Sequence, residues 1–286
     1  MRYILAGIAF ATAALLSLVS PAGAGTLDKI KASGTIIIGY RADASPFSSE
    51  GAGGKPEGFS IDLCNGIVAA TKSALQVNDL GVKYVPVTAA NRIEKLESGE
   101  VDIECGSTTR TLSREEHADF TLLIFVTGAD LLVPIDSKIS SPADLAGRKV
   151  AVLPGTTTET VLASVLKQRA IDATVVRVKD HQDGLVAITD GRADAYASDQ
   201  AILIGLALKT TNPHLFRLSG TIFSYEPYAL MVRRDDSAFR LVADRALAQI
   251  YRSGQIWDIY KRWFGLWSAD PSDLLVALYQ MQSLSD

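Results

Sequence analysis

The chain has 286 residues, of which 48% are hydrophobic, and a formal net charge of -4 at pH 7. This length allows one large domain or two of modest size, each able to bury a core. The mildly acidic balance argues against nucleic acid as a partner. Three scattered histidines, and two cysteines far apart in the sequence, argue against a metal site.

Residues 1–24 have the pattern of a secretory signal peptide. Arg2 precedes an apolar run that ends at Pro21, and Ala22-Gly23-Ala24 matches a cleavage site. A membrane anchor is the alternative, but the run is short for a bilayer span. We therefore expect cleavage near Gly25 and export of the mature chain to the periplasm as a soluble protein.

Apolar runs that alternate with amphipathic stretches indicate an α/β fold. The predicted strands include residues 35–40, 82–87, 101–104, 149–153 and 173–178, with helices between them. This alternation favours a mostly parallel sheet, in which ligands bind beyond the carboxyl ends of the strands. Arg41, Arg92 and Ser107 each lie just past a predicted strand, so we expect them on one rim.

Two long apolar stretches indicate crossings between two lobes. Residues 120–133 are interrupted by Thr127-Gly128-Ala129, and residues 223–232 contain Glu226-Pro227. We therefore expect a two-lobed fold with a ligand cleft between the lobes. The expected division places residues 25–127 and 227–286 in the first lobe and residues 128–226 in the second.

A short internal echo indicates that the two lobes are built alike. The segments Leu96 to Asp102 and Ile188 to Asp194 share one pattern: the end of a helix, a glycine, a short link, an aspartate and a strand. Ser107 lies five residues past the first aspartate, and Asp199 lies five residues past the second. The echo therefore predicts that Ser107 and Asp199 face each other across the cleft.

The segment of residues 104–109 carries groups suited to a carboxylate. Ser107 and Thr109 offer hydroxyls, and Arg114 follows in the first turn of a helix for which Ser113 is the predicted cap. Hydroxyls, helix N–H groups and a guanidinium are the natural partners of a bound carboxylate. We therefore predict that this segment holds the α-carboxylate of an amino acid.

The second lobe offers the remaining partners of an amino acid. Thr156 and Thr157 stand at a predicted helix N-terminus and add donors, while Asp199 suits an ammonium group. The groups then left at strand ends are Arg41, Arg92 and His181. Their surplus positive charge implies a ligand with an acidic side chain. Purely structural roles remain open: solvated arginines, helix caps at Thr156 or Asp199, and a polar loop histidine.

The two cysteines have two interpretations. In an oxidising compartment, Cys64 and Cys105 can form one disulfide. They can equally be two small buried apolar residues. The sequence leaves this choice open, because it does not give the distance between them.

These motifs resemble the periplasmic solute-binding proteins of polar amino-acid ABC importers, above all the glutamate/aspartate-binding proteins. The stretches that carry the resemblance include Gly39-Tyr40-Arg41, Gly58-Phe59-Ser60-Ile61-Asp62, Asn91-Arg92-Ile93, Glu104-Cys105-Gly106-Ser107-Thr108-Thr109, Gly155-Thr156-Thr157, Lys179-Asp180-His181, Ser198-Asp199 and Lys261-Arg262-Trp263-Phe264. The Glu-Cys-Gly-Ser-Thr-Thr and Lys-Asp-His stretches are similar to the acidic-ligand branch, and the others to the wider family.

The resemblance implies a type II periplasmic binding protein fold that closes on its ligand by a two-strand hinge. The implied α-carboxylate binders are Ser107, Thr109, Arg114 and Thr157; the implied ammonium partner is Asp199; and the implied side-chain carboxylate binders are Arg41, Arg92 and His181. The chain departs from the acidic-ligand branch at Ala89, where serine is frequent. The implied partners are glutamate or aspartate and a membrane permease, with no cofactor and a monomeric chain.

Two rival functions fit parts of the pattern. One is a periplasmic dehydratase-like enzyme on the same fold, for which Glu104 or His181 would supply the acid. The other is a broad polar amino-acid binder or sensor that also accepts glutamine and asparagine. A full set of groups for one ammonium and two carboxylates favours binding of an acidic amino acid without catalysis.

Overall fold

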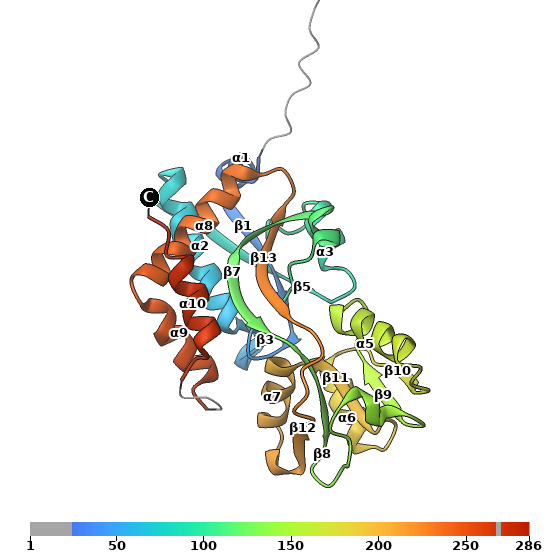
Figure 1. Cartoon of the computed structure of the whole chain (residues 1–286). Helices are drawn as coiled ribbons and strands as arrows, with labels where there is room; N and C mark the ends of the chain where they lie inside the picture. The colour runs from blue at the N-terminus through green and yellow to red at the C-terminus, as the bar shows by residue number, and fades with distance from the viewer. Residues whose placement is uncertain (1–24, 267–269, 286) are drawn as a thin grey trace, which may run out of the picture.

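The computed structural model describes residues 25–266 and 270–285, and it contains two five-stranded sheets flanked by helices. In Figure 1 the sheets lie in an upper and a lower lobe. The chain passes down from β7 (Ala118–Thr127) to β8 (Ala129–Pro134) and returns at β13 (Glu226–Arg233). The two-lobed α/β fold predicted from the sequence is therefore confirmed. The predicted signal peptide, residues 1–24, lies outside the described residues.

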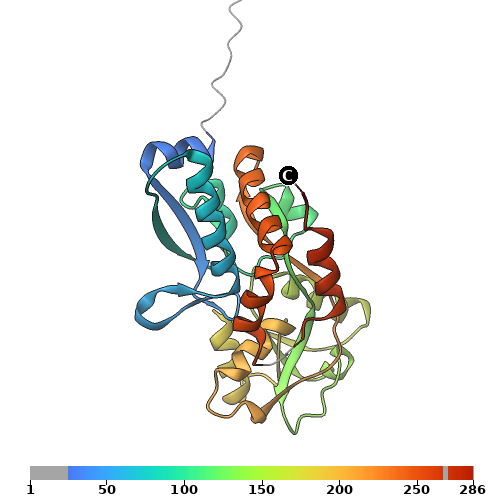
Figure 2. The same ribbon diagram turned by 90° about the vertical axis from the view of Figure 1, so that its left-hand side faces the viewer.

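The first lobe is built on a sheet of order β5-β1-β6-β13-β7. Its other strands are β1 (Thr35–Arg41), β5 (Gly81–Val87) and β6 (Ile103–Glu104), and its helices are α1 (Thr26–Ser33), α2 (Phe59–Leu75), α3 (Arg92–Glu97), α4 (Leu112–Glu115), α8 (Ser237–Arg252), α9 (Gln255–Phe264) and α10 (Asp273–Met281). A small sheet adds β2 (Asp43–Ala44), β3 (Ser48–Glu50) and β4 (Pro56–Glu57), with the 3-10 helix η1 (Ala52–Gly54) at its hairpin tip. In Figure 2, α2 and α8 stand side by side on one face of the lobe.

The second lobe is built on a sheet of order β10-β9-β11-β8-β12. Its other strands are β9 (Lys149–Val152), β10 (Thr174–Arg177), β11 (Ala195–Asp199) and β12 (Phe216–Leu218). Its helices are α5 (Thr157–Gln168), α6 (His181–Thr189) and α7 (Gln200–Leu208), with the 3-10 helices η2 (Pro142–Leu145) and η3 (Pro213–Leu215). No helix in the described part of the chain is long and apolar enough to cross a membrane.

The pairing of the strands differs from the mostly parallel sheet predicted. β1 is parallel to β5 and β6, but β13 is antiparallel to β6 and β7. In the second sheet β9 is parallel to β10 and β11, but β8 is antiparallel to β11 and β12. One strand of each sheet therefore runs against the other four, β13 in the first sheet and β8 in the second, because these are the strands that enter each lobe after a crossing.

An aromatic cluster packs the crossing strands against α9. Phe125 of β7 stacks on Phe264 of α9 with ring centroids 4.8 Å apart. Phe47 lies 5.0 Å from Phe125 and 5.0 Å from Tyr228 of β13. Pairs of this kind contribute about 0.5–1.5 kcal/mol each beyond their buried area. Phe264 of the C-terminal helix α9 is thereby packed against the strands that connect the two lobes.

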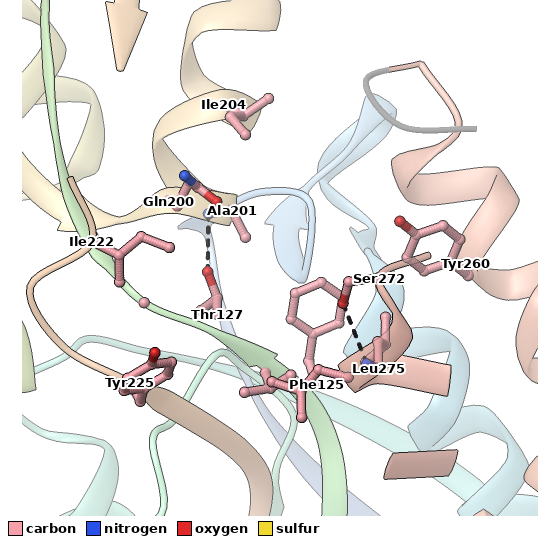
Figure 3. Close-up of a pocket in the computed structure, with 13 residues that line it drawn as sticks. Phe125, Thr127, Gln200, Ala201, Ile204, Ile222, Tyr225, Tyr260, Ser272 and Leu275 are labelled. Atoms are coloured by element: carbon pink, nitrogen blue, oxygen red, sulfur yellow. Dashed lines mark hydrogen bonds between the residues drawn. The ribbon is translucent and has the colours of Figure 1, made fainter. Parts of the chain in front are cut away.

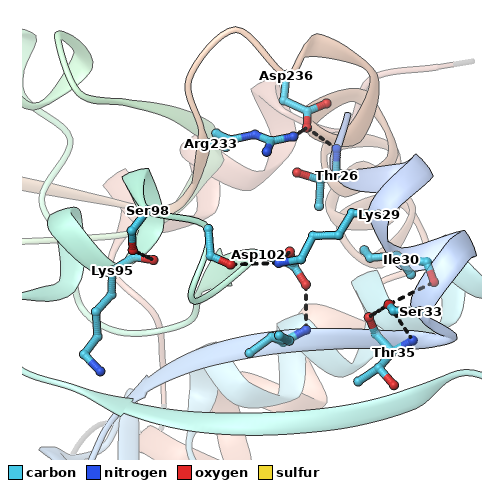
Figure 4. Close-up of polar contacts among 12 residues, drawn as sticks. Thr26, Lys29, Ile30, Ser33, Thr35, Lys95, Ser98, Asp102, Arg233 and Asp236 are labelled. Atoms are coloured by element: carbon cyan, nitrogen blue, oxygen red, sulfur yellow. Dashed lines mark hydrogen bonds and ion pairs between the residues drawn. The ribbon is translucent and has the colours of Figure 1, made fainter. Parts of the chain in front are cut away.

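The internal echo corresponds to equivalent carboxylates in the two lobes. Asp102 accepts from the backbone N–H of Ile37 in β1 and from Lys29 Nζ, both at 2.8 Å (Figure 4). Asp194 accepts from the first backbone N–H of β9, also at 2.8 Å. The glycine three residues before each aspartate has a positive φ, 73° and 69°, which favours glycine. Each lobe therefore ties its helix-to-strand link to a neighbouring strand in the same way.

Cys64 of α2 and Cys105 beyond β6 form a disulfide, with their Cα atoms 6.4 Å apart. Both residues are buried. The Ser60 hydroxyl also donates to the carbonyl oxygen of Gly106 at 2.6 Å. The structure thus selects the disulfide over two free cysteines, and it fixes the loop that carries Ser107 to helix α2.

Replacing both cysteines with serine should lower the free energy of unfolding by about 4 kcal/mol, because the bond closes a loop of 41 residues in the unfolded chain. Urea unfolding of the mature protein measures the difference, and the double Cys64→Ser, Cys105→Ser variant avoids a free thiol. Reduced wild-type protein serves as the second comparison. Equal unfolding free energies for all three forms would contradict the prediction.

Candidate ligand-binding site

A buried pocket between the lobes collects the predicted site residues. Its lining includes eight of the nine: Arg41, Arg92, Ser107, Thr109, Thr156, Thr157, His181 and Asp199. The ninth, Arg114, lies beside it and donates from Nη1 to the carbonyl oxygen of Thr109 at 2.7 Å. Residues placed at separate strand ends by the sequence pattern therefore meet in one cleft, with Ser107 and Asp199 contributed by different lobes.

Helix α4 positions Arg114, but its cap differs from the prediction. The hydroxyl of Thr111 accepts from the backbone N–H of Arg114 at 3.2 Å. Ser113 lies inside the helix, and its hydroxyl is 3.1 Å from that of Thr111. The predicted cap at Ser113 was wrong because Thr111 has the extended backbone that an N-cap residue adopts. Arg114 nevertheless lies in the first turn.

Two arginines of the first lobe point at one carbonyl group of the second. The Nη2 atoms of Arg114 and Arg92 lie 3.4 and 3.5 Å from the carbonyl oxygen of Gly155. Gly155 has a φ of +77°, and a Cβ there would lie 3.1 Å from the carbonyl oxygen of Ala89 in the first lobe. Both the backbone conformation and this close approach favour glycine. The two lobes are thus in direct contact at this side of the cleft.

Arg92 is buried and has no carboxylate partner in the part of the chain that the structure describes. Its exposed fraction is 3%, and its Nε has no hydrogen-bond partner there. Burial, together with the charges of Arg114 and Arg41, lowers the pKa of Arg92 to about 9. The alternative of a solvated surface arginine is therefore wrong. An anionic ligand group would satisfy the free donor and offset the neighbouring positive charges.

Arg41 has an internal partner that the sequence pattern did not reveal. Arg41 is 1% exposed, and its guanidinium donates from Nε and Nη2 to the carboxylate of Asp43, both at 3.1 Å. Asp43 also accepts from the backbone N–H of His181 in the second lobe at 3.2 Å. Burial acts to raise the pKa of Asp43, but Arg41 and His181 hold it below its ordinary value. Arg41 therefore has a carboxylate in direct contact, whereas Arg92 has none among the described residues.

His181 begins helix α6 and is buried, which excludes the polar-loop alternative. Its Nδ1 shares a hydrogen bond of 2.7 Å with the hydroxyl of Tyr196. Burial lowers the pKa of His181 to about 4, although Asp43 acts in the opposite direction. The imidazole ring is therefore neutral near pH 7, and it would face a ligand as a neutral hydrogen-bonding group.

Thr156 and Thr157 differ in the partners of their hydroxyls. The Thr156 hydroxyl caps α5, because it accepts from the backbone N–H of Glu159 at 3.2 Å. It also donates to a backbone carbonyl three residues earlier, at 2.8 Å. The Thr157 hydroxyl instead donates to the carboxylate of Glu226 at 2.6 Å and lies 3.3 Å from the Thr109 hydroxyl. Thr157, and not Thr156, thus reaches toward the first lobe with its hydroxyl.

Asp199 ends β11 at the start of α7, yet its carboxylate does not cap that helix. It accepts from the Thr158 hydroxyl at 2.8 Å and from the hydroxyl of Tyr228 in the first lobe. Burial and the charge of Glu226 raise the pKa of Asp199 to about 6, although both hydroxyls and Arg114 act to lower it. A cationic group beside this carboxylate would favour its ionised form.

Four residues of the site were missed by sequence reasoning: Asp43, Thr158, Glu226 and Tyr228. A signal existed for one of them, since Glu226 is a lone acid inside the apolar stretch that returns to the first lobe. The other three are ordinary residues in their local sequence. Their importance comes from partners that lie in another element.

The pocket is tightly closed in this structure. The cavity volume of the pocket is only about 10 Å³. This is room for about one water molecule. An amino acid can therefore enter only when the lobes move apart, and the crossings at β7–β8 and β13 are the segments about which they would move.

A larger pocket of about 500 Å³ lies beside the hinge strands (Figure 3). Phe125 of β7, Ile204 of α7 and Leu275 of α10 contribute to it, and its polar groups come from residues such as Gln200 and Ser272. None of the 13 residues that line it carries a charge. A zwitterionic ligand therefore matches the pocket between the lobes and not this one.

The hinged two-lobed fold and the charged cleft define a solute-binding protein. Residues 36–266 match the family of bacterial extracellular solute-binding proteins, family 3, and the chain belongs to this family. It is 40% identical over 255 residues to the L-glutamate/L-aspartate-binding protein of Pseudomonas aeruginosa, covering 88% of this chain and 84% of that protein. It is 37% identical over 252 residues to the glutamate/aspartate import solute-binding protein of Escherichia coli, covering 88% and 82%.

Solved structures of binding proteins share the fold. The P235GK mutant of ArgBP from T. maritima superimposes with a TM-score of 0.74 at 26% identity, covering 84% of this chain and 99% of that chain. An ancestral amino acid-binding protein, AncCDT-1, described as a precursor of cyclohexadienyl dehydratase, gives a TM-score of 0.72 at 28% identity, covering 84% and 100%. These relatives are binding proteins, and the chain is accordingly a binding protein and not an enzyme.

Binding of a ligand with an ammonium group should weaken as the pH falls below about 6, because Asp199 has a pKa of about 6 in the free protein. The ammonium group would lower that pKa, so binding below pH 6 must release a proton, at a loss of up to about tenfold per pH unit. Calorimetric titration with glutamate between pH 5 and 7 measures the effect.

The matched control is Asp199→Asn, which removes this titration but keeps His181 and the arginines. The variant should bind more weakly at pH 7 and show a flatter pH profile than the wild type. Parallel profiles for the two proteins would contradict the role given to Asp199.

Proposed function

We propose that this chain is the substrate-binding component of an amino-acid ABC importer and that it captures glutamate or aspartate. The observation that carries the proposal is the buried guanidinium of Arg92, which has a free Nε and shares a pocket with the carboxylate of Asp199. A cleft with an unsatisfied cation at one place and a carboxylate at another suits a ligand that carries both charges. The similarity to two glutamate/aspartate-binding proteins supports the same conclusion.

In this proposal each ligand group has its own partners. Arg114, in the first turn of α4, binds the α-carboxylate together with Ser107 and the backbone N–H groups near Thr157 at the start of α5. Asp199 accepts from the ammonium group. The proposed binders of the side-chain carboxylate are Arg41, Arg92 and His181. Arg92 is the main one, because Asp43 already pairs with Arg41 and the His181 ring is neutral.

The mechanism is hinge closure without chemistry. The open form admits the ligand, and the closed form surrounds it with groups from both lobes. Because those contacts coexist only in the closed state, the ligand shifts the equilibrium by its difference in affinity for the two states. The closed form then delivers the amino acid to the membrane permease.

The location and organisation of the chain follow from the same proposal. Membership of an extracellular solute-binding family supports export, and we propose that residues 1–24 are removed as a signal peptide. We propose a first lobe of residues 25–127 and 227–286, a second of residues 128–226, and a monomeric mature protein. The separate sheets of the two lobes support this division.

Replacing Arg92 with alanine should weaken the binding of glutamate and aspartate by about 2–5 kcal/mol, because the side-chain carboxylate of the ligand is left buried without its partner. Glutamine and asparagine should lose less, since their amides carry no charge. Calorimetric titration of the mature wild type and Arg92→Ala with all four amino acids and with alanine measures the difference.

The matched control is Arg148→Ala, because the Arg148 side chain is 56% exposed and pairs with Asp194 away from the cleft. It should leave every affinity unchanged. Equal binding of glutamate and glutamine by the wild type would replace the acidic-specific function with broad polar amino-acid binding. No binding of any amino acid would refute the proposed function.

Replacing Arg114 with alanine should weaken the binding of acidic and amide ligands alike, by about 2–5 kcal/mol. Every amino acid carries the α-carboxylate that Arg114 is proposed to hold. The same titrations provide the measurement. Arg92→Ala is here the comparison, since it should separate acids from amides. A loss confined to glutamate and aspartate would assign Arg114 to the side-chain carboxylate instead.

A further inference from the structure

Glu226 is a buried acid at the hinge that the roles above do not use. It begins β13, pairs with Thr127 of β7 and is 1% exposed. One carboxylate oxygen, Oε1, accepts from the Ser224 hydroxyl at 2.5 Å. The other, Oε2, accepts from the hydroxyls of Thr109 and Thr157, both at 2.6 Å. A single oxygen atom therefore joins a hydroxyl of each lobe.

The direction of these hydrogen bonds limits what the two hydroxyls can do for a ligand. A threonine hydroxyl has one proton to donate and lone pairs with which to accept. Thr109 and Thr157 each donate that proton to Glu226, and both residues line the pocket. Their oxygens can then accept from an ammonium group, but they have no proton left for a carboxylate.

Negative charge gathers at the same place. Asp199 lines the pocket, and the charge of Glu226 is the main cause, after burial, of its raised pKa. The Tyr228 hydroxyl, from the strand that Glu226 begins, donates to Asp199. Arg114 is close enough to act on both acids electrostatically, but the hydrogen bonds of its guanidinium go to backbone carbonyls. Two carboxylates and two acceptor oxygens form an environment that attracts a cation.

We propose that Glu226 is a positioning residue that makes the cleft specific for ligands with a charged amino group. It takes the protons of the Thr109 and Thr157 hydroxyls, so that their oxygens face the ligand as acceptors, and it adds its own negative charge behind them. The α-carboxylate is then bound by Arg114, Ser107 and backbone N–H groups. The two threonine hydroxyls thereby exchange the carboxylate role implied by the family resemblance for an ammonium role.

This inference rests on the proposed function, because it needs a cleft that binds glutamate or aspartate. The test compares glutamate with glutarate, which has the same two terminal carboxylates without the amino group. Glu226→Gln keeps the size of the side chain and a carbonyl acceptor for the hydroxyls, and it removes the charge. Calorimetric titration of wild type and variant with both ligands gives two affinity ratios.

The wild type should bind glutamate more tightly than glutarate. Glu226→Gln should lower the affinity for glutamate by about 10- to 100-fold, the usual effect of losing one charge-assisted interaction. The affinity for glutarate should be unchanged or higher. Equal weakening of both ligands would show a merely structural role and overturn the proposal. Unchanged glutamate binding would overturn it as well.

The matched control is Asp235→Asn, which makes the same change in net charge just past the other end of β13. The Asp235 side chain is 91% exposed, so both affinities should stay at their wild-type values. Failure of the wild type to bind glutamate at all would refute the proposed function itself. Glutamate binding by the wild type with an unaltered glutamate-to-glutarate ratio in Glu226→Gln refutes the Glu226 role alone.

Thr157→Val provides a second test that does not depend on the folding of a Glu226 variant. Valine keeps the shape of threonine and removes the hydroxyl. If that hydroxyl accepts from the ammonium group, the variant should bind glutamate more weakly and glutarate as well as the wild type does. If it donates to a carboxylate, both ligands should weaken, and this result would overturn the proposal.

Discussion

The closed cleft depends on one constraint: it buries ionisable groups that are not all in contact with a group of opposite charge. Arg41 is neutralised by Asp43, but Arg92 is buried with a free Nε, and its pKa is lowered to about 9. Asp199 shows the opposite condition, a buried carboxylate whose pKa is raised to about 6. Unpaired buried charges are costly unless an opposite charge arrives. In the proposed function, a ligand with both charges would pair with both residues, and this pairing would couple binding to closure.

Local devices bring these groups to the rim with little freedom. The disulfide at Cys105 and the Ser60 hydroxyl bond fix the loop that leads to Ser107. Thr111 caps the short helix that carries Arg114. Gly155 permits the approach of the lobes to within contact distance. The proposed binding groups are therefore held on fixed elements within each lobe, and in the proposed mechanism the motion occurs at the hinge.

The hinge is also part of the site. β13 carries Glu226 and Tyr228, and both contact the second lobe in the closed cleft, through Thr157 and Asp199. The aromatic cluster around Phe125 holds the same strands against α9. A change in the position of β13 must therefore move polar groups of the site together with the lobes. This arrangement links the chemistry of the ligand to the hinge angle.

The sequence by itself determined the α/β class, the two lobes and the set of nine candidate residues, because strand ends and helix caps are encoded locally and parallel strands share a rim. It failed at one local feature, because the choice between Thr111 and Ser113 as the cap of α4 depends on their backbone angles. It also failed where the outcome depends on distant parts of the chain, as in the antiparallel strands, whose direction follows from the path of the crossings. Only the tertiary structure brought Thr109 to Glu226, which is 117 residues away, and Tyr228 to Asp199. Periodicity records which face of an element is buried, but it does not record which side chain of another element lies opposite.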